Sequence, residues 1–407
     1  MQKLLRFVRI IKSLFLCNRS GGSKTIYGSS VVLQCDMADR YLKMDGKNYS
    51  PFLDRVYSEK GFDGYNLLSI PKIYDFNSSS DFYGNVSYPF VFYTKLFHFV
   101  LIAFRLKKAA NKLLVKNYKT YLEKNNCVMV LGIQPDRALV VAANNLDLRV
   151  VDLLHGYGIN SNHKIYGYEA FKNKELSELC TDYITLDLAS KRVLENSVLR
   201  SNKKITISSV RSPLFNHKKY TLPSFCSENY SRVVLVTLQW GIERFEMKYP
   251  HADGDLHPRI KETINTCKDC FFIVKPHPVL LKNRKAIEKL KNNLTSICNA
   301  QLVANMDIFS LLNVSQFHLT IWSSSTREAS MKGIPSLIFS SDDYLFEGTN
   351  LFKEELDEKI ALRVADKSIA DIASLIRNYT VPSELLIRYQ MKVQPKNLSI
   401  AHALMLG

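Results

Sequence analysis

The sequence predicts an α/β protein made of two doubly wound domains that face each other across a cleft. Three observations indicate this. From residue 128 onward, apolar runs of strand length alternate with amphipathic helical stretches, which is the pattern of parallel sheets covered by helices on both faces. An aperiodic segment, residues 211–231, interrupts the alternation. At 407 residues and 46% hydrophobic content, the chain can build more than one core.

In the first half, the elements become clear only after residue 125. The signals from Tyr41 to Tyr88 are short, and after Pro89 a single helical pattern runs to about Lys124. Strands are then expected at 128–133, 149–154, 183–186 and 205–209, and helices at 137–145 and 189–195. We assign residues 1–215 to an N-terminal domain.

The second half alternates more cleanly. Prolines and serines in residues 211–231 mark an interdomain linker. The expected strands are 233–238, 271–275, 301–303, 317–321 and 336–339, and the expected helices are 258–266, 284–298, 307–312, 326–332 and 368–378. We assign residues 230–390 to a C-terminal domain.

The formal net charge of +17 implies an anionic partner. Eight Lys or Arg residues lie between Lys95 and Lys124 against Glu123 alone, and large apolar side chains such as Phe97 and Phe104 accompany them. This mixture suits peripheral contact with an anionic membrane better than binding to DNA. A solvated face of an amphipathic helix is an equally open interpretation of the lysines.

Several classes of protein are not indicated. No stretch approaches the ~20 uncharged apolar residues of a membrane span, and charges interrupt the apolar residues of the first twenty positions, unlike a signal peptide. A cytoplasmic protein on the inner face of the membrane is therefore expected. No nucleic-acid-binding signature is present, so nucleic acid is not an expected partner. Of eight cysteines, only Cys267 and Cys270 form a C-x-x-C, and no metal site is predicted.

Two stretches carry the candidate chemistry. The apolar run 271–274 ends in Lys275-Pro276-His277-Pro278, where the prolines stiffen a turn and hold the His277 side chain at the sheet edge. The apolar run 317–321 ends in a cluster of hydroxyl side chains and Glu328 before Gly333 and Pro335. Ser325 and Glu328 have the spacing of a capping box, and Gly333 has the place of a C′ glycine. The hydroxyl cluster consists of Ser323, Ser324, Ser325 and Thr326.

Both stretches are suited to bind a phosphate. Polar residues at the carboxyl ends of parallel strands line ligand sites in doubly wound domains, and the N–H groups at a helix start favour anions. We expect the two stretches to lie on neighbouring strands of one sheet, where they would form a single anion site.

The combination of K-P-H-P with the later S-S-x-x-x-E-A-x-x-x-G-x-P resembles the GT-B glycosyltransferase superfamily, with its two Rossmann-like domains. Within it, the likeness is to bacterial surface-polysaccharide enzymes, namely polysialyltransferases with H-P and S-S motifs and CDP-glycerol glycerophosphotransferases. The resemblance covers roughly residues 233–339 well and residues 128–209 loosely.

The resemblance implies an inverting, metal-independent transfer from a nucleotide-activated donor, with no cofactor other than this co-substrate. The acceptor would be a surface polysaccharide or a lipid-linked glycan. His277, Ser323 and Ser324 would contact the donor phosphate, Glu328 would lie near the ribose, and Lys275 would add positive charge beside the leaving nucleotide.

The catalytic base is not identified by the resemblance, because the acidic motif that supplies it in polysialyltransferases has no clear match. An acceptor hydroxyl needs a base on the N-terminal, acceptor side of the cleft. Asp136 and His155 follow strands there, and Gly156 gives the loop after His155 freedom to approach a substrate. For Asp136 a helix N-cap role, and for His155 a turn-organising role, are open alternatives.

Gln239 and Trp240 follow the first strand of the C-terminal domain and are possible substrate contacts. Two other functions remain as alternatives. One is a nucleotide-sugar epimerase of the same fold, and the other is a basic nucleic-acid-binding protein.

Overall fold

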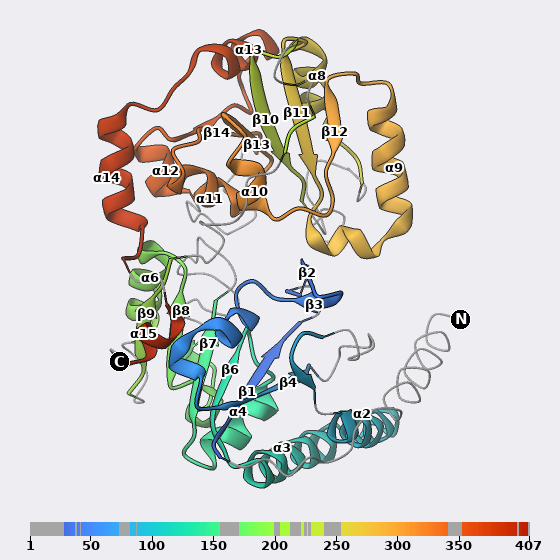
Figure 1. Ribbon diagram of the computed structural model, residues 1–407, viewed down its shortest axis with the longest axis vertical. Coiled ribbons are helices and arrows are strands. Elements are labelled where there is room, and N and C mark those ends of the chain that lie inside the picture. The colour runs from blue at the N-terminus through green and yellow to red at the C-terminus, as the bar shows by residue number, and fades with distance from the viewer. Residues whose placement is uncertain are drawn as a thin grey trace.

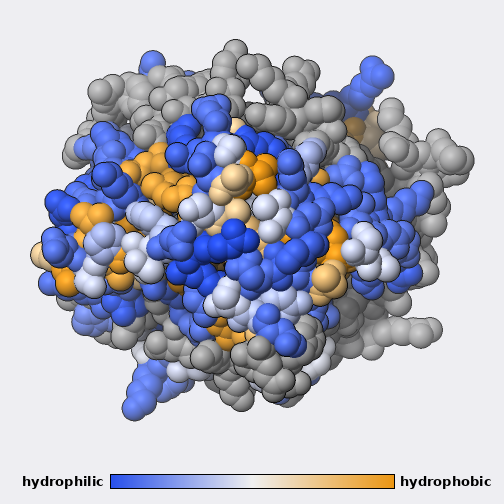
Figure 2. All heavy atoms as spheres, turned by 90° about the horizontal axis from the view of Figure 1, so that it is seen from above, coloured by the Kyte–Doolittle hydropathy of each residue, from blue (hydrophilic) through white to orange (hydrophobic). Residues whose placement is uncertain are grey.

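The chain folds into two α/β domains, one above the other in Figure 1. The computed structural model describes residues 28–36, 39–40, 42–72, 82–86, 88–154, 171–198, 204–211, 221–223, 226, 229–239, 254–340, 352–396 and 399–405. Seen from the end formed by the C-terminal domain, the surface is largely hydrophilic, with smaller hydrophobic areas between (Figure 2).

The N-terminal domain is built on a seven-stranded parallel sheet in the order β5-β4-β1-β6-β7-β8-β9. The inner strand β1 is buried along its whole length, as expected for a strand covered on both faces. The strands are β1 (Ser30–Cys35), β4 (Asn66–Pro71), β5 (Asn85–Val86), β6 (Cys127–Gly132), β7 (Arg149–Leu153), β8 (Asp182–Thr185) and β9 (Thr206–Ser209).

Helices cover this sheet on both faces. On one face, the apolar sides of α3 (Lys107–Lys124) and α4 (Arg137–Asn144) pack against it. On the other face lie the 3₁₀ helices 54–58 and 60–62 and the C-terminal helix α15 (Ile400–Met405). The remaining elements are α2 (Tyr88–Ala103), α6 (Leu188–Val198), a 3₁₀ helix at 176–178 and a hairpin of β2 (Leu42–Met44) and β3 (Lys47–Tyr49).

The C-terminal domain has a six-stranded parallel sheet in the order β12-β11-β10-β13-β14-β15. The helices α8 (Pro258–Thr266), α9 (Arg284–Thr295) and α13 (Ile369–Asn378) pack on one face, and α10 (Ile308–Leu312) and α11 (Ser325–Met331) pack on the other. The strands are β10 (Arg232–Thr237), β11 (Cys270–Lys275), β12 (Ala300–Leu302), β13 (Phe317–Thr320), β14 (Ser336–Ile338) and β15 (Ala361–Arg363).

The end of the chain returns to the first domain. After α12 (Lys353–Asp357) and α13, the helix α14 (Ser383–Val393) runs down the side of the molecule and α15 packs against the N-terminal domain (Figure 1). The Glu59 carboxylate accepts hydrogen bonds from Ser399 Oγ at 2.9 Å and from the backbone N–H groups of Ile400 at 3.3 Å and Ala401 at 2.9 Å. A carboxylate at a helix N-terminus satisfies otherwise orphaned donors, which fixes α15 in place.

The two doubly wound domains are confirmed, and every strand expected from residue 128 onward is present within a residue or two. The single helix expected from residue 89 to 124 is wrong, because the chain turns at Phe104–Leu106 and forms α2 and α3. The break has no glycine or proline signal, since Arg105 itself adopts the left-handed conformation, with φ of 61°. The expected linker, residues 211–231, lies mostly outside the described residues.

Candidate functional site

The candidate site lies where three parallel strands of the C-terminal sheet end side by side. Thr237 at the end of β10 is in register with Lys275 of β11 and with Thr320 of β13. The two motifs therefore follow strands on either side of β10, at the same end of the sheet, about 10 Å apart at the usual strand spacing. We expected the two motifs to follow neighbouring strands, and this is wrong. The motifs follow β11 and β13, and β10 lies between these two strands.

His277 is positioned by the turn that follows β11. It is the N-cap of the 3₁₀ helix Pro278–Lys282, and its Nδ1 accepts a hydrogen bond from the Val279 backbone N–H at 3.3 Å. A neutral imidazole that accepts at Nδ1 carries its proton on Nε2. The partly exposed ring is thus a donor at Nε2, which is the role that contact with an anion requires.

Lys275 is buried directly beneath this turn. Its Nζ donates to the Met306 carbonyl oxygen at 2.6 Å. Burial lowers the pKa of Lys275 to about 8, although Asp307 and Glu328 act in the opposite direction. The ammonium is therefore held below the sheet edge, and its charge acts on the site from within the domain.

Glu328 of α11 belongs to the same buried cluster. Burial and the nearby Asp307 raise the pKa of Glu328 to about 8, against the effect of Lys275. Asp307 is the N-cap of α10, where its carboxylate accepts from the Ser310 backbone N–H at 2.8 Å. The amino group of Lys275 and the carboxyl groups of Glu328 and Asp307 thus share a largely water-free space behind the strand ends, where their protonation states depend on one another.

The hydroxyl cluster divides into exposed and buried members. Ser323 is partly exposed and Ser324 exposed, whereas Ser325 and Thr326 are buried. The expected capping box is wrong: the N-cap is Ser324, and its side chain makes no cap hydrogen bond. The Ser325 hydroxyl is instead 2.8 Å from Thr237 Oγ1 and 3.2 Å from His318 Nε2, so it ties α11 to the sheet.

The predicted end of α11 is confirmed. Gly333 has φ of 76°, and the Gly333 N–H donates to the Ser330 carbonyl at 2.9 Å while the Ile334 N–H donates to the Ala329 carbonyl at 3.0 Å. These are the two hydrogen bonds of a Schellman motif. A side chain at Gly333 would also collide with Leu386 of α14, since a Cβ there would lie 2.7 Å from Leu386 Cδ2.

A buried polar layer that we did not predict braces the strand ends. His318 Nε2 lies 2.9 Å from Thr237 Oγ1, and His318 Nδ1 lies 2.9 Å from Ser336 Oγ. Burial lowers the pKa of His318 to about 3, so this ring stays neutral. Thr320 Oγ1 donates to Gln239 Oε1 at 3.3 Å, which places Gln239, a predicted substrate contact, between β10 and β13. These polar residues stand inside otherwise apolar strands, and that pattern could have predicted the buried layer from the sequence.

Arg327 of α11 forms a buried ion-pair network that no sequence pattern predicted. Its buried guanidinium donates from Nη1 to Asp187 Oδ1 at 2.9 Å, from Nε to Glu355 Oε1 at 2.6 Å and from Nη2 to Glu354 Oε2 at 2.7 Å. Tyr389 of α14 donates to the same Glu355 oxygen at 2.6 Å. Asp187 belongs to the N-terminal domain, where it also accepts from the Ser190 N–H at 2.7 Å at the start of α6. The helix that carries Ser325 and Glu328 is thereby joined to the other domain.

On the N-terminal side, Asp136 follows β6 and precedes α4. It is the N-cap residue, but its side chain makes no cap hydrogen bond. Asp136 Oδ2 instead accepts from Gln34 Nε2 and from the Tyr118 hydroxyl, both at 3.0 Å, and its backbone N–H donates to Gln34 Oε1 at 2.7 Å. Two hydrogen bonds therefore orient the carboxylate, and a third fixes the backbone of Asp136. The other predicted residues here, His155 and Gly156, lie outside the described residues, as does Trp240.

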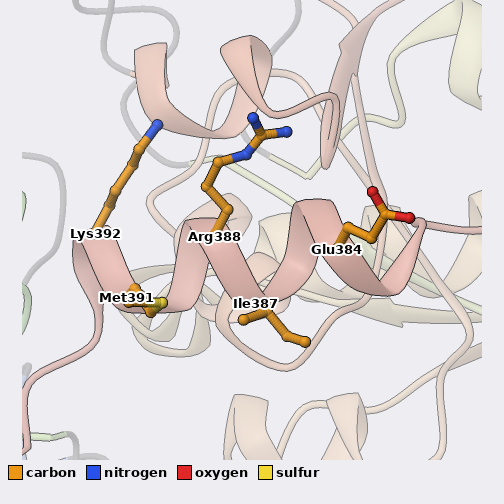
Figure 3. Close-up of a pocket in the computed structure, with 5 residues that line it drawn as sticks. All are labelled: Glu384, Ile387, Arg388, Met391 and Lys392. Carbon is orange, nitrogen blue, oxygen red and sulfur yellow. The ribbon is translucent and has the colours of Figure 1, made fainter.

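A hollow on the surface lies elsewhere, along α14. Figure 3 shows Arg388 and Lys392 pointing to one side of this helix and Ile387 to the other. Arg388 Nε lies 2.9 Å from Glu358 Oε2, and Lys392 pairs with the same carboxylate. None of the strand ends contributes to this hollow, so it is not part of the candidate site. Within the described ranges, no group of three or more His, Cys, Asp or Glu side chains is arranged to hold a metal ion.

Comparison with solved structures identifies the fold. The chain is similar to the wall teichoic acid polymerase TagF, with 13% identity over 100% of this chain and 95% of that chain and a TM-score of 0.56. It is also similar to Staphylococcus aureus MnaA in complex with UDP, with 12% identity, 93% and 95% coverage and a TM-score of 0.54. For Neisseria meningitidis UDP-GlcNAc 2-epimerase bound to UDP-GlcNAc, identity is 14%, coverage 93% and 98%, and the TM-score 0.53.

The fold is therefore GT-B, shared with a UDP-GlcNAc 2-epimerase as well as with a wall teichoic acid polymerase. No known protein family matches the sequence, and no curated protein does so.

Proposed function

We propose that the protein is an inverting, metal-independent glycosyltransferase that moves a sugar or a related group from a nucleotide-activated donor to a surface-polysaccharide or lipid-linked glycan acceptor. The observation that carries this proposal is the placement of His277 and the 323–326 segment on either side of β10, at one end of the sheet. Structures with the same fold hold UDP, UDP-GlcNAc or CDPG, which supports a nucleotide donor.

The proposed roles follow from exposure and from hydrogen-bonding capacity. His277 Nε2 and the hydroxyls of Ser323 and Ser324 donate to the donor phosphates, because these are the donors that reach the surface. Ser325 and Thr326 are buried, so they support the segment from behind. The buried charge of Lys275 stabilises the negative charge that develops on the departing nucleotide.

We assign Glu328 to the ribose side of the donor site, and Gln239, Trp240 and Gly156 to substrate contact. Glu328 with its raised pKa is protonated at neutral pH and can donate as well as accept a hydrogen bond, as recognition of a ribose hydroxyl requires.

The proton of the acceptor hydroxyl must leave as the bond to the donor forms. We assign this step to Asp136, with His155 as the alternative. The hydrogen bonds from Gln34 and Tyr118 fix the orientation of the Asp136 carboxylate. D136N keeps the shape and removes the base, so it should abolish transfer without weakening donor binding. Loss of transfer in H155A with D136N still active would move the role to His155.

Donor binding is tested by thermal stabilisation with CMP, CDP, UDP and GDP, because a ligand that binds the folded state raises its stability by mass action. One nucleotide should raise the melting temperature of the wild type and of H402A, which changes an exposed histidine on α15. The same nucleotide should have little effect on H277A. Equal stabilisation of H277A and H402A would contradict the assigned role.

An epimerase of the same fold is the second candidate, because the Neisseria meningitidis protein with this fold is a UDP-GlcNAc 2-epimerase. The two candidates differ in their need for an acceptor. Incubation with donor alone yields an isomeric nucleotide sugar in an epimerase and no new sugar nucleotide in a transferase.

The acceptor is proposed to lie at the inner face of the cytoplasmic membrane, where a lipid-linked glycan would be reached from the cytoplasm. Among the described residues, no helix is long and apolar enough to cross a membrane. We propose that the protein reaches such an acceptor with a peripheral surface.

A further inference from the structure

The turn between α2 and α3 exposes large apolar side chains. Phe97, Val100 and Phe104 follow one another at helical spacing of three and four, so they share one face of α2 and its end. Phe104 is 73% exposed, Phe97 52% and Val100 42%, and Leu106 in the turn is 51% exposed. We call these four residues and their basic neighbours Arg105, Lys107, Lys108 and Lys112 the α2–α3 surface.

These apolar residues do not belong to the hydrophobic core of the N-terminal domain. The inward face of α3 is formed by Leu114, Tyr118, Tyr121 and Leu122, which pack against the N-terminal sheet. The α2–α3 surface lies at the other end of α3, and in Figure 1 both helices lie at the bottom of the molecule, away from the C-terminal domain. Within the described part of the chain, the apolar side chains of the α2–α3 surface belong to neither hydrophobic cluster of the N-terminal domain.

The surface is also strongly basic. Arg105, Lys107, Lys108 and Lys112 are all exposed, and no Asp or Glu occurs in the sequence between Asp81 and Glu123. Cations that surround a protruding apolar group match a boundary between negatively charged head groups and hydrocarbon.

The backbone at this turn is strained at Arg105. The Arg105 N–H donates to the Ile102 carbonyl at 3.0 Å and the Leu106 N–H to the Leu101 carbonyl at 2.9 Å, the two bonds of a Schellman motif. Arg105 occupies the C′ position with φ of 61°, where glycine is preferred. A residue with a side chain is held there against its conformational preference, which points to a use for that side chain.

We propose that the α2–α3 surface docks the protein on an anionic lipid bilayer, with Phe104 and Leu106 inserted among the lipids and the basic residues on the head groups. This inference rests on the proposed membrane-linked acceptor but not on the reaction itself. A second copy of the chain fits less well, because a self-complementary contact brings like charges together. Nucleic acid would use the cations but leave Phe104 and Leu106 without a role.

The test is co-sedimentation of the full chain, without donor or acceptor, with vesicles of phosphatidylcholine that contain or lack phosphatidylglycerol. Wild type should bind only the anionic vesicles. F104S should weaken binding about tenfold through loss of inserted apolar area. K107E/K108E should weaken it further, because each cation near a charged surface contributes roughly fivefold.

Matched controls come from other helices. I387S changes a residue of α14 that is 59% exposed, but beside it Arg388 and Lys392 are paired with Glu358. K261E changes an exposed lysine of α8. Neither should affect vesicle binding by more than about twofold. The proposal is overturned if I387S weakens binding as much as F104S, if K107E/K108E binds like the wild type, or if F104S changes the oligomeric state instead.

R105G separates binding from folding. Glycine relieves the left-handed strain, so the melting temperature should stay the same or rise, while vesicle binding falls about fivefold with the lost charge. A fall in melting temperature together with unchanged binding would refute the role of Arg105. Transfer to a soluble acceptor should be retained in R105G and F104S. If the wild type and all variants bind vesicles as expected but none of them transfers a sugar, the proposed reaction is contradicted and the membrane-docking proposal is not.

Discussion

Removing the Arg327 side chain should destabilise the protein far more than removing a similarly paired arginine on the surface. The side chains of Arg327, Asp187 and Glu355 are 2%, 0% and 0% exposed. R327M would leave two buried carboxylates without a cation, and breaking a buried pair in this way costs about 3–5 kcal/mol. For a domain pair of this size, that corresponds to a melting temperature about 4–6 °C lower in a single transition.

The matched control is R377M. Arg377 Nη2 lies 2.7 Å from Asp269 Oδ1, but these side chains are 40% and 42% exposed, so the expected loss is below about 1 kcal/mol. Differential scanning calorimetry measures both variants. R327M/E355Q should recover part of the loss, because it removes one uncompensated charge. A shift for R327M no larger than that for R377M would refute the reasoning, as would an R327M/E355Q protein less stable than R327M.

Two further predictions concern the neighbourhood of α11. Because the pKa of Glu328 is raised from 4.5 to about 8, the folded state holds a proton there that the unfolded state releases. The stability of the wild type relative to E328Q should therefore fall from pH 4.5 to about pH 8, by at most about 1.4 kcal/mol per pH unit; parallel melting curves across that range would contradict it. G333A should cost about 1–2 kcal/mol for the left-handed backbone plus the collision with Leu386. G46A is the control, because Gly46 has φ of 75° and no atom within 4 Å of a Cβ, so this substitution has only the cost of the left-handed backbone. Equal losses of melting temperature in G333A and G46A would show that the collision with Leu386 contributes nothing.

The fold was predictable because the strands of both sheets from residue 128 onward are short apolar runs with helices between them. β1 and β4 were missed, because each is a brief apolar run among polar residues. β1 is placed in the sheet by pairing with β6, far along the chain, and β4 by pairing with β1. Long-range pairing of this kind leaves little local signal. The division of residues 89–124 into α2 and α3 was not predictable either. Arg105 occupies the left-handed position of the turn, where a glycine would have indicated a helix end.

The candidate site was predictable in part. The ends of β11 and β13 could be found from abrupt changes from apolar to polar residues, and the structure places both at one end of the sheet. The roles of individual residues were less accessible. Ser325 and Glu328 have the spacing of a capping box, but the burial of α11 directs Ser325 to Thr237 and His318, and Glu328 to the space shared with Lys275. Arg327 gave no signal, because its partners Asp187 and Glu355 are distant in sequence.

The return of the chain to its first domain changes what counts as a separable unit. Residues 399–405 complete the face of the N-terminal sheet that contains Val31 and Leu33, and Glu59 holds them there. A fragment cut after residue 211 would expose to water the part of that face that α15 covers, whereas fusing the α15 segment to such a fragment would restore its cover. The N-terminal domain is thus a discontinuous folding unit, assembled from residues before position 211 and from residues 399–405.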